Sequence, residues 1–166
     1  IDLSQYTLTF DDGLYSQFYY FDFFDKIPTE KIFFISSKFV SNGQRPSQHL
    51  SCVEAHKNAK DKQVYDDYMS LDDILYLHRV PNVEIGGHGH EHVNLDHLTS
   101  LFGQTRAITE DTEQMVRWFD SALGSRPKSF CFPYNNDLGG LYPMLLKGYG
   151  FERFYGKERI DVDSLS

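Results

Sequence analysis

Three histidines stand within five residues, at His88, His90 and His92, directly after two glycines at positions 86 and 87. Side chains four positions apart meet on one face of a helical turn, so His88 and His92 can hold one metal ion while His90 points elsewhere. The glycines permit close approach of the backbone. Packing alone explains such a cluster at the end of a strand poorly, and the spacing therefore predicts a metal site.

The second candidate group is the pair Asp11 and Asp12, which follows a short apolar run from Tyr6 to Phe10. Neighbouring strand residues point to opposite faces, so both carboxylates reach one site only if the chain bends, and Gly13 permits that bend. A plain turn that caps the next helix explains the same residues. Two histidines and one carboxylate are a common ligand set for a catalytic metal, because they leave positions open for water and substrate. These ligand types favour Zn²⁺, with Co²⁺, Ni²⁺ or Mn²⁺ as alternatives.

The elements that would position these residues alternate between strand and helix. Apolar runs predict strands at 6–10, 31–36, 83–85 and 129–132, with shorter candidates near Phe154 and at 159–162. Helices are expected at about 15–26, 70–79, 109–123 and 141–149. Such alternation indicates βα units around a parallel sheet, in which chemistry gathers where strands end and loops begin. The fourth predicted strand runs into Pro133 and Tyr134, which is also how an ordinary strand ends in a turn.

The length of 166 residues suits one domain, residues 1–166, with a polar insertion at about 41–68 that is partly helical. Aromatic residues make up 16% of the chain and are densest at 18–24, where most are expected to be buried in the core. The run from Ser70 to Asp73 predicts a capping box that opens a helix.

Charge and hydropathy exclude several classes of function. A formal net charge of −8 without a basic stripe argues against a nucleic-acid partner. No run of about 18 apolar residues occurs, so no membrane span is expected. Two cysteines make one disulfide at most, and Cys131 in an apolar strand is expected to be a free, buried thiol. A reducing, cytoplasmic location is the expectation, and an exported form stays open because the sequence does not begin with Met.

Taken in order, the blocks Thr9–Gly13, His88–His92 and Phe130–Tyr134 resemble the motifs of the polysaccharide deacetylases, carbohydrate esterase family 4, over about residues 6 to 155. The resemblance implies a distorted, incomplete (β/α) barrel of the α/β class with five to seven strands. It also implies a metal-dependent hydrolase that removes N-acetyl groups from a cell-surface or related polysaccharide. The carried-over roles are a general base at Asp11, metal ligands at Asp12, His88 and His92, and an oxyanion donor at the backbone N–H of Tyr134.

Two departures from the family pattern bear on mechanism. Cys131 stands where many members carry an arginine that pairs with the catalytic aspartate, and the late motifs with the general-acid histidine have no match after Tyr134. The proton donor is therefore expected from residues beyond Ser166, from a partner subunit, from Asp11 itself, or from one of five histidines: His49, His56, His78, His90 and His97. Two other functions stay open, namely hydrolysis of a small amide, imide or ureide, and a non-catalytic domain that binds sugar or metal. The sequence specifies no oligomeric state.

Overall fold

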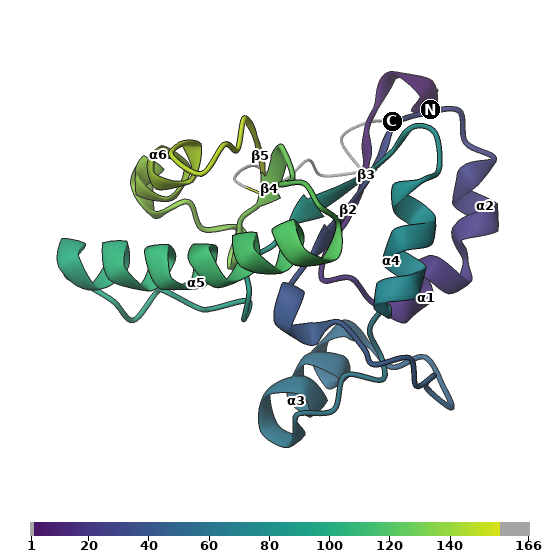
Figure 1. Ribbon diagram of the computed structural model, residues 1–166, viewed down its shortest axis with the longest axis horizontal. Coiled ribbons are helices and arrows are strands. Elements are labelled where there is room, and N and C mark those ends of the chain that lie inside the picture. The colour runs from purple at the N-terminus through teal and green to yellow at the C-terminus, as the bar shows by residue number, and fades with distance from the viewer. Residues whose placement is uncertain (1, 157–166) are drawn as a thin grey trace.

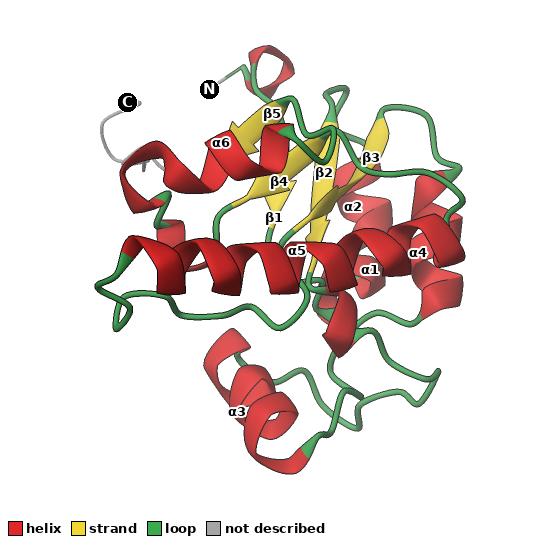
Figure 2. Ribbon diagram, turned by 60° about the vertical axis from the view of Figure 1, so that its left-hand side comes forward, coloured by secondary structure: helices red, strands yellow, loops and turns green. Residues whose placement is uncertain are grey.

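Five parallel strands form one sheet, and each strand pairs with the next one along the chain (Figure 2). The computed structural model describes residues 2–156. The strands are β1 (Leu8–Phe10), β2 (Lys31–Ile35), β3 (Val83–Gly87), β4 (Ser129–Cys131) and β5 (Arg153–Tyr155). A sheet wound in one direction in chain order curls as a barrel does, so the predicted incomplete (β/α) barrel is confirmed. The predicted strand at 159–162 lies outside the described residues.

Six α-helices connect or flank these strands in the described part of the chain (Figure 1). They are α1 (Tyr15–Tyr19), α2 (Phe21–Asp25), α3 (Cys52–Lys62), α4 (Leu71–His78), α5 (Leu101–Ala122) and α6 (Leu141–Lys147). The capping box predicted at Ser70 is present, with Asp73 as its partner. The helix expected from about 109 begins at Leu101, because the Ser100 side chain caps its first turn through the N–H of Gly103. None of the described helices combines the length and apolarity needed to cross a membrane.

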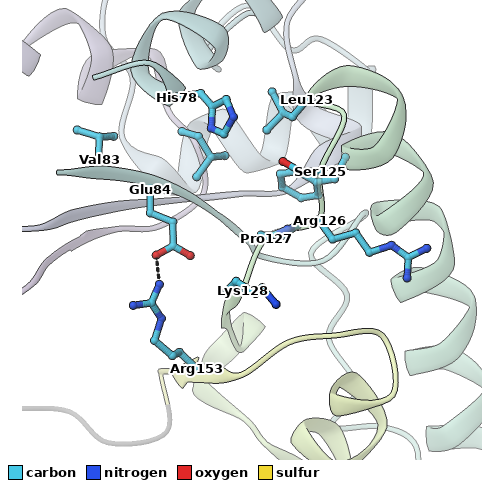
Figure 3. Close-up of a pocket in the computed structure, with 11 residues that line it drawn as sticks. His78, Val83, Glu84, Leu123, Ser125, Arg126, Pro127, Lys128 and Arg153 are labelled. Atoms are coloured by element: carbon cyan, nitrogen blue, oxygen red, sulfur yellow. Dashed lines mark hydrogen bonds and ion pairs between the residues drawn. The ribbon is translucent and has the colours of Figure 1, made fainter. Parts of the chain in front are cut away.

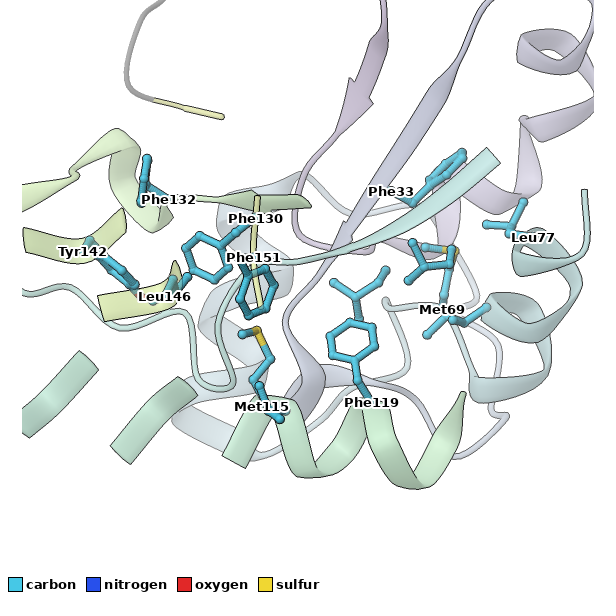
Figure 4. Packing of buried hydrophobic residues seen from close by; sticks show 14 of the residues in the cluster. Phe33, Met69, Leu77, Met115, Phe119, Phe130, Phe132, Tyr142, Leu146 and Phe151 are labelled. Atoms are coloured by element: carbon cyan, nitrogen blue, oxygen red, sulfur yellow. The ribbon is translucent and has the colours of Figure 1, made fainter. Parts of the chain in front are cut away.

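The main core lies between the sheet and the long helix α5 (Figure 4). Met115 and Phe119 of α5 are completely buried and face Phe130 of β4 and the neighbouring Phe151. Full burial of such side chains stabilises the fold by about 1.5–3 kcal/mol each. The core therefore holds α5 firmly against β3 and β4, whose carboxyl ends lead into the predicted motifs.

The aromatic segment at 18–24 is less buried than predicted. Only Phe21 is fully enclosed, at 3% exposure, whereas Tyr19, Tyr20 and Phe23 are more than half exposed. The expected single helix breaks at Tyr20 into α1 and α2. Because these two short helices cover the edge strand β1 from one side, the opposite side of each helix faces solvent.

The polar insertion forms α3 and its flanking loops, and α3 lies apart from α5 and α6 in both ribbon views (Figures 1 and 2). Ser51 and Glu54 make a capping box at the start of α3. The helix packs through Ala55 and Ala59 onto Phe39, in a small separate apolar cluster. Cys52 and His56 lie beside these alanines on the same face of the helix, whereas Val53, Glu54 and Lys57 on the other side are exposed.

Candidate metal centre

One carboxylate oxygen of Asp12 is the centre of the candidate site. The Nε2 atoms of His88 and His92 each lie 3.3 Å from Asp12 Oδ1. Ligand atoms of these three residues all lie within 4.8 Å of one another. The structure thus brings together the three side chains that the sequence motifs single out, from the ends of β1 and β3.

The backbone achieves this convergence differently from the predicted helical turn. Residues 88–92 form an irregular loop after β3, in which Gly89 and His92 have φ values of 79° and 49°. The interpretation of His88 and His92 as neighbours on a helical turn is therefore wrong, although the two rings do meet. The left-handed residues let the loop fold back within four positions. Left-handed non-glycine residues also recur at Asp12 and Tyr134, with φ of 73° and 57°, and such strained positions cluster at functional sites.

Gly13 is required where the chain leaves β1. Its φ is 73°, and a Cβ atom there would lie 2.9 Å from Cδ1 of Ile35. Any side chain at this position would clash with the end of β2 as well as strain the backbone. The glycine therefore lets Asp12 turn toward the histidines, as its position after the aspartate pair predicts.

His88 is fixed in one tautomer by its partners. Its Nδ1 donates to the backbone carbonyl of Cys131 at 2.8 Å, which leaves Nε2 directed at Asp12. Hydrogen bonding of the remote ring nitrogen to a carbonyl is the usual way in which a protein orients a metal-binding imidazole. The side chain is buried, and burial lowers the pKa of His88, but the hydrogen bond with Asp12 and the charge of Asp11 outweigh burial and raise it.

The pKa values of Asp12 and His92 are both shifted toward the ionisation states that metal binding needs. Burial raises the pKa of Asp12, but the neighbouring imidazoles of His56 and His88 lower it far below its usual range, so the carboxylate is anionic. Burial and the neighbouring His88 lower the pKa of His92 to about 3, so its ring is neutral at physiological pH. An anionic oxygen beside the neutral ring of His92 is the protonation state that a divalent ion requires, whereas His88, whose pKa is raised, would release its proton when an ion binds. The residues present therefore fit the metal ion that the motifs predict.

Asp11 differs from Asp12 in that its residue is exposed. The Sγ atom of Cys131 lies 3.5 Å from Asp11 Oδ2, so a thiol takes the place of the arginine partner expected in the family. Cys131 is buried and free, as predicted, and Cys52 is also free. The two neighbouring carboxylates thus have separate surroundings, which suits separate chemical roles.

Tyr134 lies beside the centre through both its ring and its backbone. Its ring centroid is 4.8 Å from that of His92, and its hydroxyl accepts a hydrogen bond from Lys60 Nζ at 3.0 Å. Its backbone follows β4 directly and turns sharply through the left-handed region. Tyr134 is therefore close enough to act on a group bound at the centre.

Sequence reasoning missed most of two further parts of the site: of their residues it named only His56, as a candidate proton donor. The first is Asp111 of α5, whose Oδ2 and Oδ1 accept the backbone N–H groups of His90 and Glu91, each at 2.9 Å. The carboxylate is buried and holds the histidine loop against α5, while the side chain of His90 bonds Ser37 Oγ at 2.8 Å, away from Asp12. The available signal was an aspartate within the apolar stripe of α5, where a buried charge needs a partner.

The second missed part is a row of three side chains on α3. Cys52 Sγ lies 3.0 Å from Asp12 Oδ2, His56 Nε2 lies 3.2 Å from Asp12 Oδ1, and Lys60 Nζ lies 3.3 Å from the backbone oxygen of His92. These three residues are spaced four apart, so they share one face of the helix. Their regular spacing was the signal, and it shows that the insertion contributes to the centre.

The pocket drawn in Figure 3 lies at the other end of the sheet. Its wall includes Val83 and Arg153, the first residues of β3 and β5, and an ion pair between Glu84 and Arg153 crosses it. His78, one of the five candidate proton donors, also lines this pocket. Because the centre lies beyond the carboxyl ends of the strands, this pocket and His78 are remote from it.

The chain was compared with protein families, curated sequences and solved structures, and the matches are to deacetylases and proteins of that family. The sequence pattern described as polysaccharide deacetylase matches residues 4–138. No curated protein sequence matches the chain. Among solved structures, IcaB from Ammonifex degensii has a TM-score of 0.66 at 20% identity, with 94% of this chain and 67% of that chain covered.

Two further structures extend this comparison. The chitin deacetylase from the fungus Colletotrichum lindemuthianum has a TM-score of 0.57 at 19% identity, covering 89% of this chain and 53% of that one. A pseudoenzyme of the same esterase family from Bacillus anthracis has a TM-score of 0.55 at 13% identity, covering 90% and 41%. The chain spans about two thirds or less of the length of the solved structures that it matches.

Proposed function

The chain belongs to the polysaccharide deacetylase family, and from this premise we propose that it is a metal-dependent hydrolase that removes N-acetyl groups from a polysaccharide or oligosaccharide. The observation that carries the proposal is the convergence of His88 and His92 on Asp12 Oδ1 at 3.3 Å, with Asp11 next to it in the chain. Asp12, His88 and His92 would hold the ion, with Zn²⁺ favoured by the ligand types. A divalent ion held there would lower the pKa of a water molecule to about 7 and polarise a carbonyl.

The chain's own residues supply the remaining steps. The exposed carboxylate of Asp11 would accept the proton of the attacking water, a role worth about 10²- to 10⁴-fold in rate. The backbone N–H of Tyr134 would donate to the oxyanion of the tetrahedral intermediate, which typically contributes about 3–4 kcal/mol. Asp12 would stay anionic throughout, because the imidazoles around it favour its charged form.

The partner in this proposal is a carbohydrate, such as a polysaccharide of the cell envelope, that carries N-acetylated amino sugars. The exposed rings of Tyr19 and Tyr20 and the half-exposed ring of Tyr134 offer stacking surfaces of the kind that sugar rings use. The two free thiols support the cytoplasmic, reducing location expected from the sequence, and that location stays part of the proposal.

Acetate release from a panel of N-acetylated oligosaccharides tests the proposal. The protein is stripped with a chelator and assayed before and after addition of Zn²⁺, Co²⁺, Ni²⁺ or Mn²⁺. Activity that appears only with metal supports the proposal. Release of ammonia or amine from small amides, imides or ureides, without acetate release from glycans, would favour the second enzymatic candidate.

A non-catalytic domain is the third candidate, and one observation favours it. Cys131 contacts Asp11 where many family members carry an arginine, and a pseudoenzyme is among the structures of similar fold. Sugar or metal binding without turnover in any of these assays would support that candidate. The intact set of Asp12, His88 and His92 weighs against it, because a decayed site usually loses its metal ligands.

A further inference from the structure

The second histidine-containing element at the centre is α3, which belongs to the insertion and not to the three family motifs. We infer that His56 is a fourth ligand of the proposed metal ion, so that this chain surrounds one ion with Asp12, His56, His88 and His92. The inference rests on the proposed function, because it extends the same site. It gives the insertion a direct part in metal binding.

The first support is the geometry around Asp12. The Nε2 atoms of His56, His88 and His92 lie 3.2, 3.3 and 3.3 Å from the same atom, Asp12 Oδ1. Three imidazole nitrogens thus approach one oxygen, which belongs both to the group of Asp12, His88 and His92 and to the group of Asp12, Cys52 and His56. One ion bound by all four residues requires His56 Nε2 to move closer to His88 and His92. The ring of His56 also stacks on the ring of His92, with centroids 4.7 Å apart.

The second support is that the ring of His56, like that of His88, is oriented by a hydrogen bond at Nδ1. Its Nδ1 forms a hydrogen bond with the hydroxyl of Tyr68 at 2.9 Å, just as Nδ1 of His88 bonds the carbonyl of Cys131 at 2.8 Å. Tyr68 is 1% exposed and packs against Phe39 in the cluster below α3. A buried partner on the remote nitrogen directs Nε2 into a metal site.

The third support is that His56 Nε2 lacks a hydrogen-bond partner among the described residues, although the atom is buried. It lies close to Asp12 Oδ1, but the geometry does not make a hydrogen bond. A buried ring nitrogen without a hydrogen-bond partner is unfavourable, because it has lost its contact with water. Coordination of an ion by this nitrogen would remove the cost.

Cys52 has a different part in this arrangement. Its thiol donates to Asp12 Oδ2 at 3.0 Å, on the other oxygen from the one that the imidazoles face. The contact leaves Oδ1 as the single oxygen available to the ion and fixes the plane of the carboxylate, as outer-shell partners of metal ligands do. The rival arrangement is a separate ion held by Asp12, Cys52 and His56, whose ligand atoms also lie within 4.8 Å of one another.

Four protein donors also narrow the choice of ion. A catalytic site needs at least one further position for water, so the ion must accept five or six ligands. Zn²⁺ can expand to five, and Co²⁺, Ni²⁺ and Mn²⁺ reach five or six readily. Zn²⁺ is therefore compatible with four protein ligands and one water, as are Co²⁺, Ni²⁺ and Mn²⁺.

The first test counts the imidazole ligands without an activity assay. The full chain is labelled with ¹⁵N-histidine, freed of metal, and titrated with Zn²⁺ while the ring nitrogens are followed by NMR. We expect Nε2 of three histidines to change, and His56→Ala, His88→Ala and His92→Ala each to remove one of these signals. Changes at two histidines, with His56 unaffected, would overturn the inference and leave the proposed function standing.

The second test uses affinity and a matched control. Calorimetric titration with Zn²⁺ is expected to show one site per chain, and His56→Ala to weaken it by more than about 100-fold, beyond the 10- to 100-fold typical of a residue that only orients a ligand. His49→Ala, an exposed histidine of the same insertion that packs against tyrosine rings, should bind as the wild type does. Circular dichroism of the metal-free variants checks that both fold.

The third test separates the rival arrangement. With Co²⁺ in place of Zn²⁺, we expect no thiolate-to-cobalt charge-transfer band, and Cys52→Ser should bind within a few-fold of the wild type. A strong thiolate band, or two ions per chain, would overturn the single-ion arrangement in favour of the Asp12, Cys52 and His56 site. A wild-type protein that binds none of these ions would refute both this inference and the proposed function.

Discussion

Asp111 on α5 holds the histidine loop through His90, whose backbone N–H donates to Asp111 Oδ2 at 2.9 Å. The other carboxylate oxygen accepts the N–H of Glu91 at the same distance. The histidine loop of the candidate metal centre is thus bound to α5 through its backbone N–H groups. The side chain of His90 forms its hydrogen bond with Ser37 instead. The backbone position of His90 therefore matters to the site, whereas its imidazole does not.

The first prediction follows from this division. His88→Ala and His92→Ala should each weaken Zn²⁺ binding at least about 100-fold, because each removes a ligand. His90→Ala should retain the metal, since its ring bonds Ser37 Oγ at 2.8 Å and does not face Asp12. Metal content after gel filtration measures all three. Full occupancy in the first two variants, or loss in the third alone, would refute the assignment.

The second prediction separates Asp11 from Asp12. Asp11→Asn should keep the metal and lose about 10²- to 10⁴-fold in kcat, because the variant lacks only the proposed base. Asp12→Asn should weaken metal binding itself, because the anionic oxygen that three imidazoles approach is replaced by a neutral amide. Metal content and acetate release are measured on both proteins. Equal metal loss in the two variants would show that both aspartates are ligands.

The third prediction concerns the stability of the histidine loop. Asp111→Ala leaves the N–H groups of His90 and Glu91 without their acceptor, so the free energy of unfolding should fall by about 1–3 kcal/mol. Zn²⁺ affinity should fall about 10- to 100-fold, as for other residues that position ligands. Asp120→Ala, on the exposed side of the same helix, is the control. It removes only a surface ion pair with Arg126, so it should lower the free energy of unfolding by no more than about 1 kcal/mol and leave the Zn²⁺ affinity unchanged. Urea denaturation and calorimetry provide the measurements.

The effect of Asp111→Ala on the free energy of unfolding should depend on pH. Burial raises the pKa of Asp111 above 3.8, although the N–H groups of Glu91 and His90 oppose it, and the nearby charges are those of His90, Glu91 and Lys38. The folded state therefore binds the proton of Asp111 more tightly than the unfolded state does. Its contribution to stability is greatest below the unfolded pKa and falls as pH rises through the folded pKa. The stability difference between wild type and Asp111→Ala should shrink from pH 4 to pH 7, and a difference that grows would contradict the raised pKa.

The sequence predicted the sheet well, because its strands are short, apolar runs that stop at glycine, proline or aspartate. Four predicted strands and the candidate near Phe154 match β1 to β5 within a few residues. It predicted the helices less well. Tyr20 breaks one predicted helix, and α5 extends toward the N-terminus over Gly103, a residue that disfavours helices and so hid the true start at Leu101. Capping by Ser100 outweighs that local cost.

The centre was predictable only where its residues are close in sequence. The motifs at 11–12 and 88–92 resemble those of the polysaccharide deacetylases, and their convergence was inferred from that resemblance. Cys52, His56 and Asp111 reach the same place from other elements, and their distances depend on how α3 and α5 pack. No local pattern specifies such packing, although the spacing of 52, 56 and 60 and the buried position of 111 were visible in the sequence.

The fourth prediction concerns the thiol beside Asp12. Burial, and then the hydrogen bond to Asp12, raise the pKa of Cys52 to about 12. At pH 8 its thiolate fraction is then roughly 10⁻⁴, against about a quarter for an ordinary cysteine, so alkylation of the metal-free protein should be about 10³-fold slower than that of a free thiol. Iodoacetamide labelling of Cys131→Ser, followed by mass spectrometry, measures the rate at Cys52 alone. Asp12→Asn should accelerate it, and an ordinary rate in the parent would contradict the contact.

The five histidines considered as proton donors lie in very different places. His49 is exposed among tyrosine rings, His78 lines the pocket at the amino ends of the strands, and His97 is exposed. His90 bonds Ser37. Within the described residues, His56 is the member of this group that contacts Asp12. Geometry therefore leaves one candidate among the five, and the inferred role of that residue is to bind metal.

The last prediction tests the five histidines together. Replacement of His49, His78, His90 or His97 by Gln should leave kcat for acetate release within a few-fold, because none of these rings reaches the centre. His56→Gln should lose activity in proportion to its loss of metal, and saturating metal should restore most of kcat if the ring is a ligand alone. If kcat instead stays about 10²- to 10⁴-fold lower at full metal occupancy, His56 also donates the proton to the leaving amine. Full activity in all five variants would exclude these imidazoles and leave the protonated Asp11, a partner subunit or sequence outside residues 1–166 as the donor.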